Sequence, residues 1–432
     1  MLQAMSKPRR AFYMFGLILA GEAVFALPFH VARFFRPTVL EVFSLSATEL
    51  GAAQGIYGIV AMLAYFPGGP LADRFPARTL LAASLWTTAA GGLYMASFPD
   101  FQGALWLWGF FGVTTILLFW AALIRATRDW GGDVAQGRAY GLLDSGRGLL
   151  AAGLASVGVL LFSLSFPEGY GAASFEDKRQ ALRLIILGYT AVTALAGLFV
   201  WFALADPGAD RKQAEMRSRP RAGRVTADIV RVMKLPAVWL QAIVIVCAYV
   251  GYKGFDNYSL FAVQAYGLDE VAAAGVVTLA SWLRPVAALA AGLLGDRHTI
   301  SRITVLAFAL LLGSNVFFAA TTPIPGATAI LLGNTLLACA AFFGLRGLYY
   351  ALFEEARVPA AVTGTAVGLV SVIGFTPDIF VNYVAGALID ATPGVGGHQH
   401  FFWFLSAFSA LGVLASYSLM RINTNARTED SR

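Results

Sequence analysis

The chain has 432 residues, of which 58% are hydrophobic and only 13% are charged. Soluble globular proteins carry roughly 25% charged residues, so this composition excludes an ordinary soluble domain. The formal net charge of +6 would suit a nucleic-acid-binding protein, but the positive residues are distributed as membrane topology predicts, which argues against that class.

Apolar runs of about 20 residues recur along the whole sequence, and a helix of that length crosses a hydrocarbon core of about 30 Å. Helices are expected because lipid offers the backbone no hydrogen-bond partner. We therefore predict an all-α membrane protein with about twelve transmembrane helices in two pseudo-symmetric bundles of six. The predicted spans are 11–32, 47–67, 79–98, 103–124, 139–164, 182–205, 236–260, 271–294, 303–321, 327–350, 361–388 and 400–420.

The first apolar run follows Lys7, Arg9 and Arg10 and resembles a signal peptide. It is too long for one, contains Glu22 and lacks a cleavage site of small residues, so we interpret it as a retained first helix. With the N-terminus placed in the cytoplasm, that side holds 22 Lys and Arg residues and the other side holds five. The positive-inside rule then places both termini in the cytoplasm of a bacterial inner membrane.

A polar stretch at 206–234 contains eight Lys and Arg residues and few apolar ones. We interpret it as the cytoplasmic linker between an N-terminal bundle at 1–205 and a C-terminal bundle at 235–432. A lipid-headgroup or partner-binding site is the alternative for this basic segment. Inside the spans, Pro28, Pro285 and Pro377 are each expected to bend or break a helix, because proline removes a backbone donor.

The segment from Gly68 to Arg78 is a charged hinge between two apolar runs, and a weaker copy runs from Gly292 to Arg302. Their aspartates, Asp73 and Asp296, lie 223 residues apart, about half the chain. The spacing indicates that the second half repeats the first.

The first hinge, followed by a basic central linker and a second six-helix half, resembles the cytoplasmic signature of the major facilitator superfamily. The matching residues are Gly69, Leu71, Ala72, Asp73, Arg74 and Arg78 in the first half, and Gly292, Leu294, Asp296 and Arg297 in the second. Pro76 and Ala77 depart from the family pattern. The resemblance implies that Gly69, Asp73, Arg74, Arg78, Asp296 and Arg297 form a latch between the cytoplasmic ends of the bundles. Arg346, placed near the cytoplasmic end of its span, is predicted to serve the latch or the topology.

Ionisable residues inside the spans carry the functional prediction, because a charge at the bilayer centre costs about 2.5–3.5 kcal/mol on insertion scales. The third, sixth, ninth and twelfth spans contain none of the eight internal charges, which are Glu22, Asp144, Arg147, Lys253, Asp256, Arg284, Arg346 and Asp378. The family resemblance implies that the other eight helices line a central cavity, so these charges are expected to border it. Three stretches (120–128, 252–256 and 363–380) are also similar to bacterial sugar-phosphate and organic-anion permeases.

Four carboxylates are candidates for proton coupling: Glu22, Asp378, Asp144 and Asp256. Burial favours the neutral form of a carboxylate, which suits Glu22, predicted near the membrane midplane. The candidates for substrate binding are Arg284, Lys253, Tyr249, Asn257, Gln54, Tyr57 and Arg147. The alternatives are a static network that joins Glu22 and Arg284, and mutual neutralisation of Asp144 with Arg147 and of Lys253 with Asp256, each three residues apart.

The sequence contains no Walker-type phosphate loop and no nucleophile elbow, and we predict neither an enzyme nor a bound cofactor. The two cysteines and the His398–His400 pair do not make a metal site. We predict a monomeric secondary transporter that moves a small polar, anionic solute, with protons as the coupling ion and symport as the mode. The alternatives are an exporter of amphiphilic compounds, favoured if aromatics line the cavity and a protein carboxylate occupies Arg284, and a non-transporting membrane sensor.

Overall fold

The computed structural model describes residues 6–132, 136–204, 232–349, 351–352 and 370–430. Every element in these ranges is a helix, as the sequence predicts. The first half contains α1 (Lys7–Phe25), η2 (Ala26–His30), α2 (Val31–Phe34), α3 (Arg36–Val42), α4 (Ala47–Arg74), α5 (Ala77–Met95), α6 (Phe101–Gly112), η3 (Val113–Trp120), α7 (Ala121–Gly131), α8 (Gln136–Leu164), η4 (Tyr170–Ala172) and α9 (Phe175–Ala203). The second half contains α12 (Pro236–Gly254), η5 (Phe255–Asn257), α13 (Tyr258–Tyr266), α14 (Glu270–Ser281), α15 (Leu283–Arg297), α16 (Ile300–Ala320), α17 (Thr328–Leu348), α20 (Pro377–Ala391) and α21 (Val395–Asp430).

Eleven helical stretches in the described ranges are long and apolar enough to cross a membrane. The helix α5 is a further long helix, at the position of the predicted third span, so the architecture of about twelve spans is confirmed. Large apolar side chains are exposed on the outside of the bundle, among them Trp106 and Phe202. An apolar outer surface is what lipid-facing helices require.

Some span limits differ from the prediction for local reasons. The helix α4 continues to Arg74, so the glycines and prolines predicted to form a hinge from Gly68 lie in its last turns. The turn comes later, at Phe75 and Pro76. The helix α9 begins seven residues before the predicted span, because Ser174 and Asp177 form a capping box that satisfies its first backbone donors.

All three predicted proline sites coincide with an interrupted helix. Pro28 lies in the π-helical segment η2, and Pro285 lies in the first turn of α15, just after the break between α14 and α15. Pro377 is in the first turn of α20. Proline is tolerated at a helix start, where the missing donor has no partner to lose.

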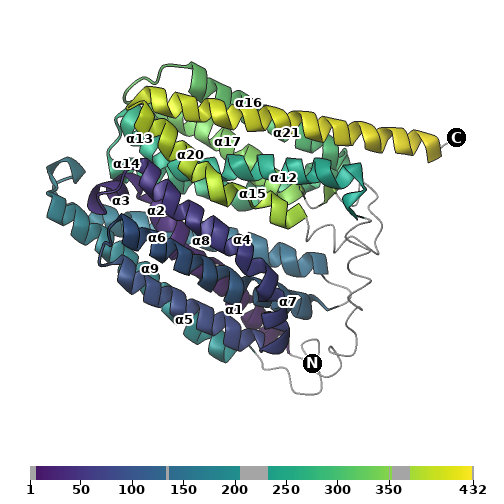
Figure 1. Cartoon of the computed structure of the whole chain (residues 1–432), viewed down its shortest axis with the longest axis horizontal. Helices are drawn as coiled ribbons and strands as arrows, with labels where there is room; N and C mark the ends of the chain where they lie inside the picture. Colours follow the sequence, from purple (N-terminus) through teal and green to yellow (C-terminus); the bar gives the residue numbers. More distant parts are fainter. Residues whose placement is uncertain (1–5, 133–135, 205–231, 350, 353–369, 431–432) are drawn as a thin grey trace.

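The helices α1 to α9 pack against one another, as do α12 to α21, and the two groups appear in Figure 1 as the purple-to-blue and the teal-to-yellow helices. We call the face where α1 begins and α21 ends the terminal side, and the other face the opposite side. The predicted domain limits fall in the linker 206–234, most of which lies outside the described residues.

The two halves meet most closely on the opposite side, where α4 crosses α20. The crossing depends on glycine: a Cβ on Gly51 would lie 2.2 Å from the carbonyl oxygen of Asn382, and one on Gly386 would lie 2.2 Å from that of Ala47. At the outer end, the Asp390 carboxylate accepts hydrogen bonds from the backbone N–H (2.7 Å) and the hydroxyl (2.6 Å) of Thr48. A carboxylate from the second half therefore caps the first turn of α4.

Candidate substrate-binding cavity

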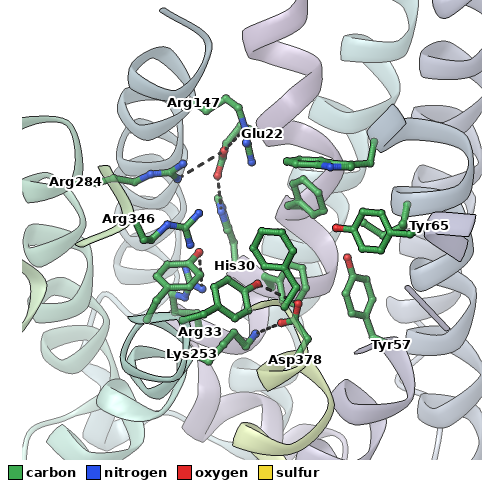
Figure 2. A pocket seen from close by; sticks show the side chains of 17 residues that line it. Glu22, His30, Arg33, Tyr57, Tyr65, Arg147, Lys253, Arg284, Arg346 and Asp378 are labelled. Atoms are coloured by element: carbon green, nitrogen blue, oxygen red, sulfur yellow. Dashed lines mark hydrogen bonds and ion pairs between the residues drawn. The ribbon is translucent and has the colours of Figure 1, made fainter. Parts of the chain in front are cut away.

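An open cavity, with about 730 Å³ of atom-free space including the solvent at its mouth, lies between the halves (Figure 2). It is bordered by α1, η2, α2, α4, η3 and α8 from the first half. From the second half it is bordered by α12, α15, α17, α20 and the segment just before α20. Among the described residues, the lining side chains are Glu22, Phe25, Phe29, His30, Arg33, Tyr57, Tyr65, Ile116, Trp120, Arg147, Tyr249, Tyr252, Lys253, Arg284, Arg346, Phe375 and Asp378. The predicted concentration of charges at a shared cavity is thus present.

One wall is built around Glu22, and we call it the Glu22 cluster (Glu22, His30, Asp144, Arg147 and Arg284). The carboxylate Oε1 lies 3.1 Å from His30 Nε2, and Oε2 lies 3.3 Å from Arg147 Nε and 3.9 Å from Arg284 Nη1. Arg284 also reaches Asp144 at 3.1 Å. A single buried carboxylate therefore faces three nitrogen-bearing side chains from α8, α15 and η2.

The wall toward the opposite side is built around Asp256, and we call it the Asp256 cluster (Arg33, Tyr249, Lys253, Asp256 and Asp378). Asp256 pairs with Arg33 at 2.6 Å and with Lys253 at 2.7 Å. Lys253 also lies 3.3 Å from Asp378, which accepts a hydrogen bond of 3.0 Å from the Tyr249 hydroxyl. The Arg33–Asp256 pair joins the two halves, and removing one partner of such a buried pair typically costs about 3–5 kcal/mol.

Arg346 stands between the two clusters (Figure 2). Its guanidinium lies 4.0 Å from the centroid of the Tyr252 ring and 5.8 Å from that of Tyr249, at cation–π distance. Within the described part of the chain it forms no ion pair, and its buried Nη1 atom has no hydrogen-bond partner. The sequence placed Arg346 near the end of its span, as a latch or topology residue, whereas the structure places it in the cavity wall.

The remaining wall is aromatic. Eight of the seventeen lining side chains are Phe, Tyr or Trp. Phe25 and Trp120 lie at cation–π distance from the Arg147 guanidinium, with 5.6 and 5.9 Å to the ring centroids. The Tyr57 hydroxyl is held by Thr115 at 2.9 Å. Such rings bind apolar or flat parts of a ligand by contact and stacking, so the cavity offers both charged groups and ring faces to a ligand.

The repeat of 223 residues is visible in the site itself. It relates Arg33 to Asp256, so the residues of this ion pair occupy equivalent positions in the two halves. The same offset relates His30 to Lys253, and each of these nitrogens contacts a carboxylate. The helix is irregular at this level in both halves, as the π segment η2 and the 3₁₀ segment η5.

Most of the predicted binding residues line the cavity, namely Arg284, Lys253, Tyr249, Tyr57 and Arg147. The other two lie behind its wall: Asn257 donates to Asn382 at 3.2 Å, and Gln54 accepts from Arg36 at 3.4 Å.

Of the proton-coupling candidates, Glu22 and Asp378 line the cavity. Asp144 and Asp256 do not, but each pairs with a cation that does. The transport role of all these residues stays a prediction.

Two local pairings were proposed from sequence spacing, and only one is present. Lys253 and Asp256 do pair along their helix. Asp144 and Arg147 do not neutralise each other: Arg147 turns to Glu22 and Asp144 to Arg284. Contacts between helices therefore decide the partners, because both arginines find a carboxylate on a facing helix.

The predicted latch residues lie on the terminal side. Gly69, Asp73 and Arg74 belong to the last turns of α4. Arg78 stacks on Trp201 of the same half at 4.9 Å. Arg297 ends α15, and the side chain of Asp296 lies outside the described residues. The latch remains a prediction.

Sequence reasoning missed two polar residues of the cavity, His30 and Arg33. Arg33 follows the end of the first predicted span, and the structure buries it against Asp256. The offset of 223 was the available signal, because it aligns both residues with the charged pair Lys253 and Asp256.

Comparison with known proteins identifies the family to which this chain belongs. The family model of the Major Facilitator Superfamily matches residues 18–380. The inner membrane protein YqcE of Escherichia coli K12 is 28% identical over 390 residues, which cover 89% of this chain and 88% of that protein. The inner membrane protein YihN of the same organism is 25% identical over 412 residues and 94% of each chain.

Among solved structures, a bacterial homologue of the human lysosomal transporter Spinster, in an inward-facing and occupied conformation, aligns with a TM-score of 0.73. The alignment covers 96% of this chain and 98% of that structure at 15% identity. At this identity the similarity supports the fold alone.

Proposed function

The chain belongs to the major facilitator superfamily, and on that premise we propose that it carries a small organic anion across a bacterial inner membrane by alternating access. The proposal rests on the balance of positive and negative side chains in the cavity wall. Five cations line it against two carboxylates. When Asp144 and Asp256 are counted as well, one cation is still in excess, and Arg346 is the one without a carboxylate partner in the described chain.

An unpaired buried cation is costly unless an anion accompanies it. A guanidinium presents a planar fork of donors that matches a carboxylate or a phosphate, so an organic anion is the ligand that Arg346 suits best. The stacking faces of Tyr249 and Tyr252 hold the guanidinium from one side. Its remaining donors are left for a ligand.

The accessibility of the cavity supports alternating access. On the opposite side, Arg33–Asp256, Thr48–Asp390 and the glycine crossing of α4 with α20 close the route between the halves. Toward the terminal side the side chain of Asp144 is 56% exposed, against 1% for Asp256. With the termini in the cytoplasm, as the positive-inside rule predicts, this is an inward-facing state. The halves at 1–205 and 235–432 would rock about the site, joined by the linker 206–234.

We propose that a proton gradient drives transport, with the anion and a proton carried in the same direction. Glu22 and Asp378 are the carboxylates that border the cavity, so both are positioned to exchange a proton with bound water in either state. Asp144 and Asp256 serve in this scheme as partners that hold Arg284 and Lys253 in place. A monomer suffices for the mechanism, because both walls of the cavity come from one chain.

A second candidate, export of amphiphilic compounds, is favoured by two observations. The cavity is rich in aromatic side chains, and Asp144 already occupies Arg284. The excess of cations in the wall favours an anion over the amphiphilic cations that aromatic cavities also bind. The two candidates can therefore be distinguished by ligand charge where the amphiphilic compound is a cation.

A thermal-unfolding screen of the purified protein tests this difference. We expect carboxylates and phosphates such as gluconate, benzoate and glycerol 3-phosphate to raise the melting temperature, while glucose, benzyl alcohol and glycerol at the same concentrations do not. Saturation at 100 times Kd would stabilise the folded state by about 2.7 kcal/mol. Stabilisation by tetraphenylphosphonium and by none of the anions would reject the anion proposal in favour of the exporter.

A further inference from the structure

His30 and Glu22 are a buried acid–base pair in the wall of the cavity. His30 lies in the π segment η2, eight residues after Glu22, and its Nε2 atom is 3.1 Å from the Glu22 carboxylate. Both residues are 3% exposed. The other ring nitrogen, Nδ1, is buried and has no hydrogen-bond partner among the described residues. Imidazole is the side chain whose charge ordinarily changes near neutral pH, so this pair can exist in two charge states.

The surroundings of His30 leave Glu22 as its ionisable partner. From α9, the ring of Tyr189 lies 6.1 Å away, and its hydroxyl donates to the carbonyl of Leu154 instead. From α2, Phe34 contacts the ring edge-on at 5.7 Å. The nearby cations of the Asp256 cluster, Arg33 and Lys253, are held by Asp256.

The charged groups beyond Glu22 come from α8 and α15. Arg147 and Arg284 share the second oxygen of the same carboxylate, at 3.3 and 3.9 Å. Asp144 balances Arg284, and Arg346 stands next to this group in the wall without a carboxylate. The Glu22 carboxylate therefore contacts His30 through one oxygen and the two arginines through the other.

We propose that His30, rather than the Glu22 carboxylate itself, binds the proton that travels with the anion, and that its protonation draws Glu22 away from Arg147 and Arg284 and frees these arginines for the substrate. This inference rests on the proposed anion transport. Protonation adds one positive charge to the Glu22 cluster, so an anion binds more tightly. Because coupling between two ligands is reciprocal, a bound anion also favours the protonated ring. The imidazolium and the anion then cross together, which gives symport.

The second half supplies a comparison within the molecule. Lys253 occupies the position equivalent to His30 and contacts two carboxylates, Asp256 at 2.7 Å and Asp378 at 3.3 Å. An ammonium between two carboxylates keeps its charge through the physiological range, whereas an imidazole beside one can lose it. The two halves thus place a nitrogen-bearing side chain at equivalent positions. Of the two, the imidazole of His30 is the side chain suited to gaining and losing a proton during transport.

The direct test is histidine NMR of the full chain in detergent, with His30→Gln used to assign the signal. Addition of gluconate or benzoate at a fixed pH is expected to move the His30 ring toward its protonated form. A ring that stays in one form with and without the anion, at pH 5.5 and at pH 8, overturns the proposal.

Anion affinity measured at pH 5.5 and 8 gives the second readout. The wild type is expected to bind about tenfold more tightly at pH 5.5, within the range of coupled sites, and His30→Gln should vary less than about twofold. His400→Gln, at an exposed histidine, is the matched control and should keep the wild-type dependence. Affinity that is independent of pH in the wild type contradicts the role of His30 but leaves anion transport standing. Failure of all anions to bind contradicts the transport proposal itself.

Discussion

Replacing Arg346 by glutamine is expected to weaken anion binding by about 10- to 100-fold, because a hydrogen bond to a charged group contributes roughly 1.5–3 kcal/mol and about 1.4 kcal/mol is a factor of ten. The substitution removes the one lining cation that has no carboxylate partner in the described chain. The measurement is the shift of melting temperature as a function of anion concentration.

The fold should tolerate this change. Among the described residues no buried carboxylate loses an ion pair, and the main contacts of the Arg346 guanidinium are the rings of Tyr252 and Tyr249. Arg346→Lys is the matched control: it keeps the charge, loses the planar fork and should show an intermediate affinity. Wild-type affinity in Arg346→Gln would show that the anion does not bind at Arg346, and the argument from the excess cation would fail.

The second large effect is expected on conformation. In Gly386→Ala the new Cβ would lie 2.2 Å from the carbonyl oxygen of Ala47, a backbone atom of α4. Helix α4 cannot yield as a flexible side chain would, so α4 and α20 must separate. Overpacking of this kind costs roughly 1–3 kcal/mol, which would shift the population toward the state open on the opposite side by about 5- to 150-fold.

Distances between spin labels on the opposite side measure this shift. Glu168→Cys and Ile324→Cys place labels on exposed loop residues of the two halves, while the native Cys247 and Cys339 are buried. A longer distance population should dominate in Gly386→Ala. Gly188→Ala is the control, since a Cβ there meets no atom within 4 Å. An unchanged distribution in Gly386→Ala would show that the α4–α20 crossing does not close this side.

The fold could be predicted from the sequence because lipid imposes it. Apolar runs of fixed length, the distribution of Lys and Arg and the 223-residue repeat each follow from how a chain satisfies its backbone and places its charges in a bilayer. The sequence also identified the charges that face the cavity, Glu22, Arg147, Lys253, Arg284 and Asp378.

The pairing of these charges could not be predicted, because it depends on the rotation and register of facing helices. Spacing alone joined Asp144 to Arg147, whereas each found a partner on another helix. For the same reason Arg346 was assigned to the membrane boundary. The contact between His30 and Glu22 could not be predicted, because it depends on the π-helical geometry of η2, in which His30 lies. The sequence predicts only that Pro28 disturbs the helix there.

The cavity is proposed to be a transport site that opens in turn to each side of the membrane. Uptake of a labelled anion into proteoliposomes tests it most directly, with the anion chosen from those that stabilise the protein. We predict time-dependent uptake that an inward proton gradient drives above equilibrium. Glu22→Gln should abolish that accumulation and retain exchange of the anion between the two sides. Binding without any flux in the folded wild-type protein would contradict transport and favour a membrane sensor.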